Sequence, residues 1–165
     1  MELATPALAA WVFLSFALPL GLYTVWSDLS QMKILNPVVT LLFAGYVITG
    51  PFVLELDAYL WRYSHFAVAL LFGFVLNIAG GLGAGDAKFI AAAAPLTAVQ
   101  DLFFVFLILT GMLFTTLITH RIFRATRLKN FAPDWKSWEP GNRFPMGFAL
   151  APTLILYLVL CGLSG

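Results

Sequence analysis

Long apolar runs separated by short polar stretches follow one another along this chain. A helix that crosses the hydrocarbon layer of a bilayer needs about 20 mostly apolar residues, because each residue advances it by about 1.5 Å across about 30 Å. Six such runs, two of them short, predict helices at 6–26, 37–54, 66–79, 87–98, 102–123 and 147–163. The pattern therefore predicts an all-α, polytopic membrane bundle of about six transmembrane helices.

The third and fourth runs are separated by the glycine-rich stretch 80–85, which would break a helix, and Pro95 limits the fourth run. These two runs could therefore form one re-entrant unit rather than two spans. Neither a repeat nor a low-complexity linker divides the chain, so we expect residues 1–165 to form a single membrane-embedded domain.

The composition agrees with a membrane protein. Of the 165 residues, 61% are hydrophobic and 10% are charged, whereas a typical soluble domain is about 25% charged. One cysteine, Cys161, cannot support a disulfide framework or a Cys-x-x-Cys zinc site. Because no lysine or arginine precedes Lys33, we expect no cleavable signal peptide. We expect membrane lipid, and no nucleic acid, among the partners.

Positive charges are unevenly distributed among the predicted loops. With the N-terminus placed outside, eight of the nine lysines and arginines fall in cytoplasmic loops, as the positive-inside rule requires. Arg62 alone falls in an external connection, and Asp101 falls in the next one. A re-entrant fourth run would move the basic loop 120–143 outside, so six spans are favoured. We expect this basic and aromatic loop, which includes Arg143, to anchor at the membrane surface, or alternatively to dock a substrate peptide.

Two of the eight acidic residues, Asp28 and Asp86, adjoin apolar runs on the predicted cytoplasmic side. A charge at the membrane edge is costly and is a functional candidate by default. Two carboxylates that share a site do not both ionise easily, so one keeps a proton and the pair can act as base and acid on one water. Asp28 and Asp86 are therefore a candidate catalytic pair for peptide hydrolysis.

Other catalytic chemistries lack their residues in this sequence. His65 and His120 are predicted on opposite faces and have no partner at metal-binding spacing, so no metal or other cofactor is expected. Neither a Gly-x-Ser-x-Gly elbow nor a Walker-type phosphate loop is present. The glycines before Asp86 could open the backbone so that an extended substrate pairs with it, or could form a hinge or a tight turn. Asn77 is predicted to form an interhelical hydrogen bond.

Three short motifs resemble one known family. Gly83-Ala84-Gly85-Asp86 resembles the Gly-x-Gly-Asp motif of the intramembrane aspartic peptidases, and its continuation through Lys88 resembles the type IV prepilin peptidases. Asp28, followed by Lys33-Ile34-Leu35-Asn36, is similar to that family's first aspartate followed by a basic residue, Ile, Pro and Asn. Phe144-Pro145-Met146-Gly147 is similar to its Pro-aromatic-Gly stretch. Leu35 and Met146 depart from the family pattern.

The resemblance implies a cofactor-free membrane aspartic endopeptidase in which Asp28 and Asp86 activate water. Its expected substrate is a type IV prepilin or pseudopilin, whose leader is cleaved at the cytoplasmic face of the bacterial inner membrane. The length resembles the short, Flp or tight-adherence form. Longer members also methylate the new N-terminus and carry paired Cys-x-x-Cys motifs that this sequence lacks, which argues against methyltransferase activity. The resemblance further implies substrate-binding or loop-shaping roles for Gly83, Gly85, Lys88, Lys33, Asn36, Pro145 and Gly147.

Lys88 has three possible roles: it could stabilise an ionised Asp86, bind substrate, or extend to anionic headgroups. Three alternatives to the whole assignment also stay open. One is a presenilin-like or preflagellin-type peptidase with the same acid pair and another substrate, the second is a small transporter, and the third is a structural subunit. No oligomeric state is predicted.

Overall fold

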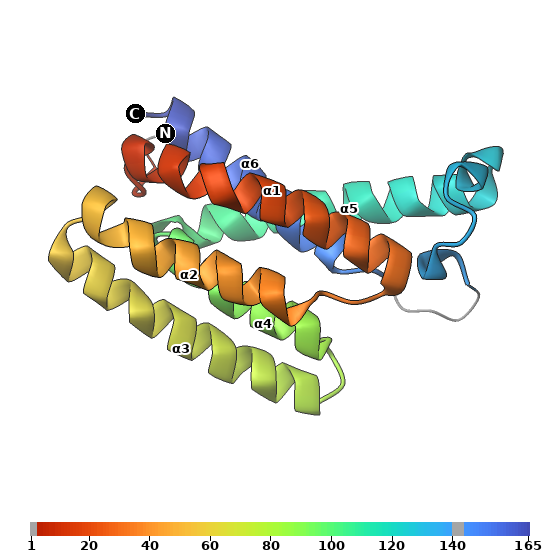
Figure 1. The fold of residues 1–165 in the computed structure, drawn as a ribbon, viewed down its shortest axis with the longest axis horizontal. Helices are drawn as coiled ribbons and strands as arrows, with labels where there is room; N and C mark the ends of the chain where they lie inside the picture. Colours follow the sequence, from red (N-terminus) through yellow and green to blue (C-terminus); the bar gives the residue numbers. More distant parts are fainter. Residues whose placement is uncertain (1–2, 140–143) are drawn as a thin grey trace.

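The computed structural model describes residues 3–139 and 144–165, which form six α-helices and no β-strand (Figure 1). The all-α helical bundle expected from the sequence is confirmed. Arg143, part of the predicted basic loop, lies outside the described residues. The helices are α1 (Ala7–Gln31), α2 (Asn36–Val53), α3 (Leu56–Ile78), α4 (Ala84–Ala93), α5 (Leu102–Ala125) and α6 (Gly147–Leu163).

Successive helices run back and forth along the long axis of the bundle, and both termini lie at one end (Figure 1). The short helix α4 continues through two 3₁₀ helices, η1 (Ala94–Leu96) and η2 (Val99–Asp101). Asp101, which ends this stretch, accepts hydrogen bonds from the backbone of Ala4, near the N-terminus. The segment after α3 therefore returns to the end that holds the termini, as a separate pass does and a re-entrant turn would not.

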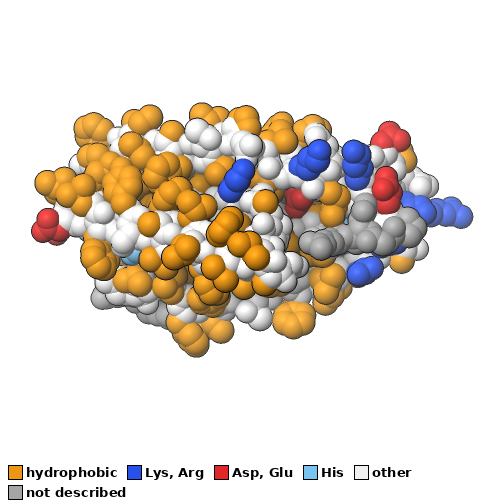
Figure 2. All heavy atoms as spheres, turned by 90° about the horizontal axis from the view of Figure 1, so that it is seen from below, with side chains coloured by type: hydrophobic (Ala, Val, Ile, Leu, Met, Phe, Trp, Pro, Cys, Tyr) orange, Lys and Arg blue, Asp and Glu red, His pale blue; other side chains and the backbone are white. Residues whose placement is uncertain are grey.

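Four helical stretches are long and apolar enough to cross a membrane: Ala7–Gln31, Asn36–Val53, Leu56–Ile78 and Val99–Ala125. Helix α6 is apolar but shorter. Helix α4 has ten residues, about 15 Å of helix, which is half of the hydrocarbon thickness. Hydrophobic side chains cover much of the face in Figure 2, and lysines and arginines lie mainly towards one end. Large apolar side chains point outward along α3 and α5, which suits contact with lipid better than contact with water.

Helix α3 begins at Leu56, well before the predicted start at residue 66. Asp57, Arg62 and His65 lower the hydropathy of this part of the helix, so the apolar pattern placed it in a loop. Asp57 is exposed in the first turn, where a negative charge suits the helix dipole. The prediction that Arg62 lies in an external connection is wrong, because Arg62 is 5% exposed inside the bundle. Asp101 is likewise buried, not in an exposed loop.

Close packing between helices brings the three sequence motifs to one end of the bundle. Helix α1 packs along α6, which sets the last turn of α1 beside Gly147, the first residue of α6. Helix α3 packs along α4, and Gly73 meets Ala87 so closely that a Cβ at position 73 would lie 2.9 Å from the Ala87 Cβ. These two packed pairs carry Asp28 and Asp86 respectively.

Candidate active site

Asp28 occupies the last turn of α1 and is 5% exposed. The helix ends at Met32, whose left-handed backbone (φ 56°) lets its N–H donate to the Asp28 carbonyl at 2.8 Å. A residue with a side chain rarely adopts this conformation, so the turn is a constrained feature of the site. It directs the chain away from α1 and towards Asn36, where α2 begins.

The start of α6 holds the Asp28 carboxylate. The backbone N–H of Gly147 donates to Asp28 Oδ2 at 2.6 Å, and the N-terminus of a helix favours a negative charge. A Cβ at position 147 would lie 2.9 Å from the same oxygen, so glycine is needed for this approach. Pro145 is fully buried, and its carbonyl accepts the Phe148 N–H. The Asp28 motif and the Phe144–Gly147 motif are thus in direct contact.

Asp86 lies in the first turn of α4, three residues after the N-cap Gly83. Its carboxylate accepts the N–H of Gly83, the reciprocal bond of a capping box. Any Cβ at position 83 would overlap Asp86 Oδ2, so the glycine leaves room for the carboxylate. Burial raises the pKa of Asp86 to about 6, although the bond from Gly83 acts in the opposite direction.

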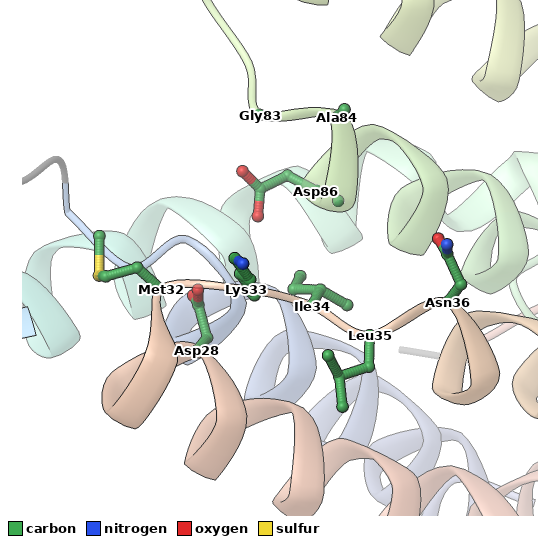
Figure 3. Close-up of a pocket in the computed structure, with 10 residues that line it drawn as sticks. Asp28, Met32, Lys33, Ile34, Leu35, Asn36, Gly83, Ala84 and Asp86 are labelled. Carbon is green, nitrogen blue, oxygen red and sulfur yellow. The ribbon is translucent and has the colours of Figure 1, made fainter. Parts of the chain in front are cut away.

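Gly85 allows the two aspartate-bearing segments to meet. A Cβ at this position would lie 3.3 Å from the Ile34 Cβ, so α4 packs against the chain that leaves α1. The two segments enclose a cavity of about 370 Å³. Figure 3 shows the Asp28 and Asp86 side chains projecting into this space from α1 and α4. The lining residues are Asp28, Met32, Lys33, Ile34, Leu35, Asn36, Gly83, Ala84, Gly85 and Asp86.

Lys88 is exposed, and its Nζ donates to Asn36 Oδ1 at 3.0 Å. The contact connects α4 with the first residue of α2. Lys33 and Asn36 line the cavity, whereas Lys88 is outside its lining. Pro37 falls in the first turn of α2, where a proline is well tolerated.

The glycines before Gly83 form a tight turn at the end of α3. Gly80 has φ 75°, its N–H donates to Asn77, and the Gly81 N–H donates to Leu76, which is a Schellman motif. The predicted interhelical bond of Asn77 is wrong, because its Nδ2 donates to the Leu82 carbonyl within this turn at 2.8 Å. The polar side chain supports the glycine turn and does not connect two helices.

Sequence reasoning assigned no site role to four residues that line the cavity, because none of their side chains carries reactive chemistry: Met32, Ile34, Leu35 and Ala84. Among residues 3–139 and 144–165, no group of three or more His, Cys, Asp or Glu could hold a metal ion. Two of the side chains that line the cavity, Asp28 and Asp86, are carboxylates. One of them can hold a proton while the other accepts one.

The fold and the site together define a helical bundle, compatible with a membrane protein, with a carboxylate pair in a cavity at one end. Comparisons with protein-family models, with curated proteins and with solved structures find no match for this chain. The relation to the type IV prepilin peptidases therefore rests on the motif resemblance alone.

Proposed function

We propose that this protein is a membrane aspartic endopeptidase that removes the leader peptide of a type IV prepilin or pseudopilin of the Flp class. The observation that carries the proposal is the shared cavity of Asp28 and Asp86, which are 58 positions apart in the chain and belong to different helices. These are the same two aspartates that the motif resemblance selects. Membrane helices around the cavity suit a substrate that is itself anchored by an apolar helix.

The proposed reaction is hydrolysis by general acid–base catalysis. The ionised aspartate removes a proton from a water molecule, whose oxygen attacks the scissile carbonyl carbon, while the protonated aspartate donates to the carbonyl oxygen. The C–N bond of the tetrahedral intermediate then breaks, and the leaving amine takes up a proton. The raised pKa of Asp86 supports this scheme, because it lets a carboxyl group near neutral pH hold the proton that the pair needs.

The orientation in the membrane is part of the proposal. The cavity end also carries Lys33, Lys88 and the basic end of α5, so the positive-inside rule assigns it to the cytoplasmic face. A prepilin leader is short and basic and precedes the apolar helix, so it would reach this face while its helix stays in the lipid. The bacterial inner membrane is the location that this substrate requires.

The test is cleavage of a co-expressed Flp-type prepilin by wild type, Asp28→Asn and Asp86→Asn, with membrane insertion checked for each. Asp57→Asn is the matched control, because Asp57 is an exposed acid in the first turn of α3, at the end of the bundle away from the cavity. We expect wild type and the control to cleave and both cavity variants to fail. Retained cleavage in either cavity variant would contradict the acid pair.

A panel of other membrane-anchored substrates separates the alternatives. Cleavage of a preflagellin but not of a prepilin, lost in the same two variants, would keep the peptidase and change its substrate. Absence of cleavage of every substrate by an inserted wild type would favour a transporter or a structural subunit.

A further inference from the structure

A second buried polar cluster lies at the end of the bundle that holds the termini. It consists of Thr5, Arg62, Asp101 and Tyr157, which we call the clasp. These side chains are between 0% and 6% exposed, and they come from the N-terminal segment, α3, η2 and α6. The proposed hydrolysis uses none of them. Burying an arginine and an aspartate is costly unless both are hydrogen-bonded, so their partners indicate what the cluster does.

Asp101 is hydrogen-bonded on several sides. Both of its carboxylate oxygens accept the Ala4 N–H at 3.0 Å, and Oδ2 also accepts the Thr5 N–H at 3.3 Å. The Tyr157 hydroxyl donates to the same oxygen at 2.7 Å. That hydroxyl in turn accepts the N–H of Ala98, in the segment that follows η1. Asp101 and Tyr157 therefore connect the N-terminus, α6 and the chain beyond α4.

Arg62 connects α3 to the same segment. Its Nη1 donates to the Pro95 carbonyl at 3.2 Å, and its Nη2 donates to Thr5 Oγ1 at 3.4 Å. The charge of Asp101 acts on the guanidinium, and Thr5 bonds to both residues. Arg62 and Asp101 are thus connected through Thr5, and Arg62 Nη1 also bonds to a backbone carbonyl of η1.

That carbonyl lies just beyond the C-terminal end of α4, where the neighbouring Ala94 carbonyl accepts the Thr97 hydroxyl at 2.8 Å. The last carbonyls of a helix lack intrahelical partners, and in a membrane such groups must be satisfied within the protein. Pro95 has no N–H to donate back to α4. The guanidinium supplies a donor at this point, and a positive charge at a helix C-terminus also suits the helix dipole. Arg62 and Thr97 together supply donors to the carbonyls of Pro95 and Ala94 at this end of α4.

The clasp and the cavity are at opposite ends of α4. Asp86 lies in its first turn, and η1 follows its last residue. Between them, Ala87, Ala91 and Ala92 are buried small residues, and Phe89 is buried in the hydrophobic core. At the cavity end the chain enters α4 from the glycine turn, where even a Cβ added at Gly80 would meet no other atom within 4 Å. At the opposite end, the clasp supplies buried hydrogen bonds to the segment that follows α4.

We propose that the clasp sets the axial position of α4, and through it the placement of the Asp86 carboxylate relative to Asp28. Arg62 is then a positioning residue. A helix transmits an axial displacement along its whole length, and a misplacement of about 1 Å at a reacting group can cost about 100-fold in rate. The consequence for rate rests on the proposed function, whereas the anchoring of α4 does not.

The first experiment measures amide hydrogen exchange by mass spectrometry on the purified protein in detergent micelles. The variants are Arg62→Met, which keeps the length of the side chain, and Tyr157→Phe, which deletes one oxygen. Tyr63→Phe is the matched control, because it makes the same deletion where the hydroxyl bonds to Tyr59 of its own helix. We expect exchange in 87–96 to accelerate about tenfold in Arg62→Met and less in Tyr157→Phe, with α2 and the control unchanged.

Two results would overturn the proposal. One is unchanged exchange in 87–96 for both clasp variants, and the other is an equal acceleration throughout the bundle, which indicates a general loss of stability. If the Arg62→Met protein does not insert into the membrane, exchange in 87–96 is measured instead in Tyr157→Phe and in the double variant Arg62→Met/Asp101→Asn. The double variant removes both charges, so we expect it to insert better than Arg62→Met.

The second experiment measures prepilin cleavage by the same variants. We expect Arg62→Met to lower kcat about tenfold with little change in KM, and Arg62→Lys to restore part of the loss, because an ammonium can still donate to Pro95. A change confined to KM, or equal loss in the lysine and methionine variants, would contradict a positioning role. If wild type cleaves no prepilin, the hydrogen-exchange data still test whether the clasp anchors α4. If wild type cleaves and exchange is unaffected, the clasp proposal fails and the peptidase proposal stands.

Discussion

The aspartates at the two ends of the bundle have different hydrogen-bonding surroundings. At the cavity end, Asp28 accepts bonds from the N–H groups of Gly147 and Phe148, and Asp86 accepts one from Gly83, while both carboxylates face an open space of about 370 Å³. At the other end, Asp101 accepts bonds from two backbone N–H groups and a tyrosine hydroxyl. The carboxylates at the cavity end can accept further hydrogen bonds from water or a bound molecule. The carboxylate of Asp101 instead uses its acceptor capacity to connect segments of the chain.

The difference shows why a buried charge is not by itself a sign of catalysis. An ionised carboxylate can accept about four hydrogen bonds, so one with several protein donors has little capacity left for water or substrate. A carboxylate beside a cavity keeps that capacity, and its burial favours a bound proton. The same residue type thus stabilises the fold at one end and is available for chemistry at the other.

The largest expected effect separates activity from stability at the cavity. Asp28→Asn and Asp86→Asn should each lower prepilin cleavage about 1,000-fold or more, because each removes the acid or the base. Neither should lower the thermal unfolding temperature in micelles, since a neutral amide costs less to bury than a carboxylate. A variant that loses activity together with its folded state would not support a catalytic role.

The reverse result is expected at the clasp. Asp101→Ala should lower the free energy of unfolding by about 3 kcal/mol or more, because the N–H groups of Ala4 and Thr5 and the Tyr157 hydroxyl lose their acceptor inside the bundle, at about 1 to 3 kcal/mol each. Denaturant titration in mixed micelles measures this difference. The exposed Asp57→Ala should change it by no more than about 0.5 kcal/mol. Similar values for the two variants would mean that Asp101 is not structurally important.

A pair of glycine substitutions sharpens the contrast within the cavity. Gly147→Ala places a Cβ 2.9 Å from Asp28 Oδ2 and 3.1 Å from Ile34 Cδ1, so the carboxylate must shift. We expect cleavage to fall about 100-fold. Gly111→Ala is the control, since its Cβ meets nothing within 4 Å. It should leave cleavage unchanged and stabilise α5 slightly, and equal effects on cleavage would contradict the role of Gly147.

The pH dependence of cleavage reports the acid pair. Catalysis needs one proton on the pair, and Asp86, with a pKa of about 6, holds its proton below that pH. Activity should therefore decline by up to about tenfold per unit as the pH rises above the higher apparent pKa, which lies at about 6 or above. Initial cleavage rates in micelles between about pH 4 and about 9 measure the profile. A rate that is constant across this range would exclude acid–base catalysis by the pair.

The smallest effect is expected at Lys88. Its contact with Asn36 joins two exposed side chains, and such a contact is worth about 1 kcal/mol or less. Lys88→Met should therefore retain partial cleavage, within about tenfold of wild type. Asn36→Leu should resemble it, because either change removes the same hydrogen bond. Complete loss in Lys88→Met alone would show that the lysine acts on substrate or on Asp86.

Part of this architecture could be predicted from residue pattern alone. Apolar runs are a local property, so the number of helices was predicted correctly, and α6 was predicted with its observed bounds. Helix α3 was predicted too short, because a hydropathy pattern cannot distinguish an exposed Arg62 from one that a partner segment satisfies. The hydrogen bond of Asn77 was predicted to join two helices for a similar reason. Its actual acceptor, the Leu82 carbonyl, is brought close by the turn at Gly80 and Gly81, which a hydropathy pattern does not show.

By itself, the sequence determined an all-α chain with apolar helices and two acids beside glycine or at a helix end, because these features depend on neighbours along the chain. Only the tertiary structure decided which acids face a cavity and which are saturated with hydrogen bonds. The glycine motif selected Asp86, whereas nothing near Asp101 in the sequence predicts that it is buried and bonded to several donors. The donors around Asp101 come from Ala4 and Tyr157, distant positions that only folding brings together.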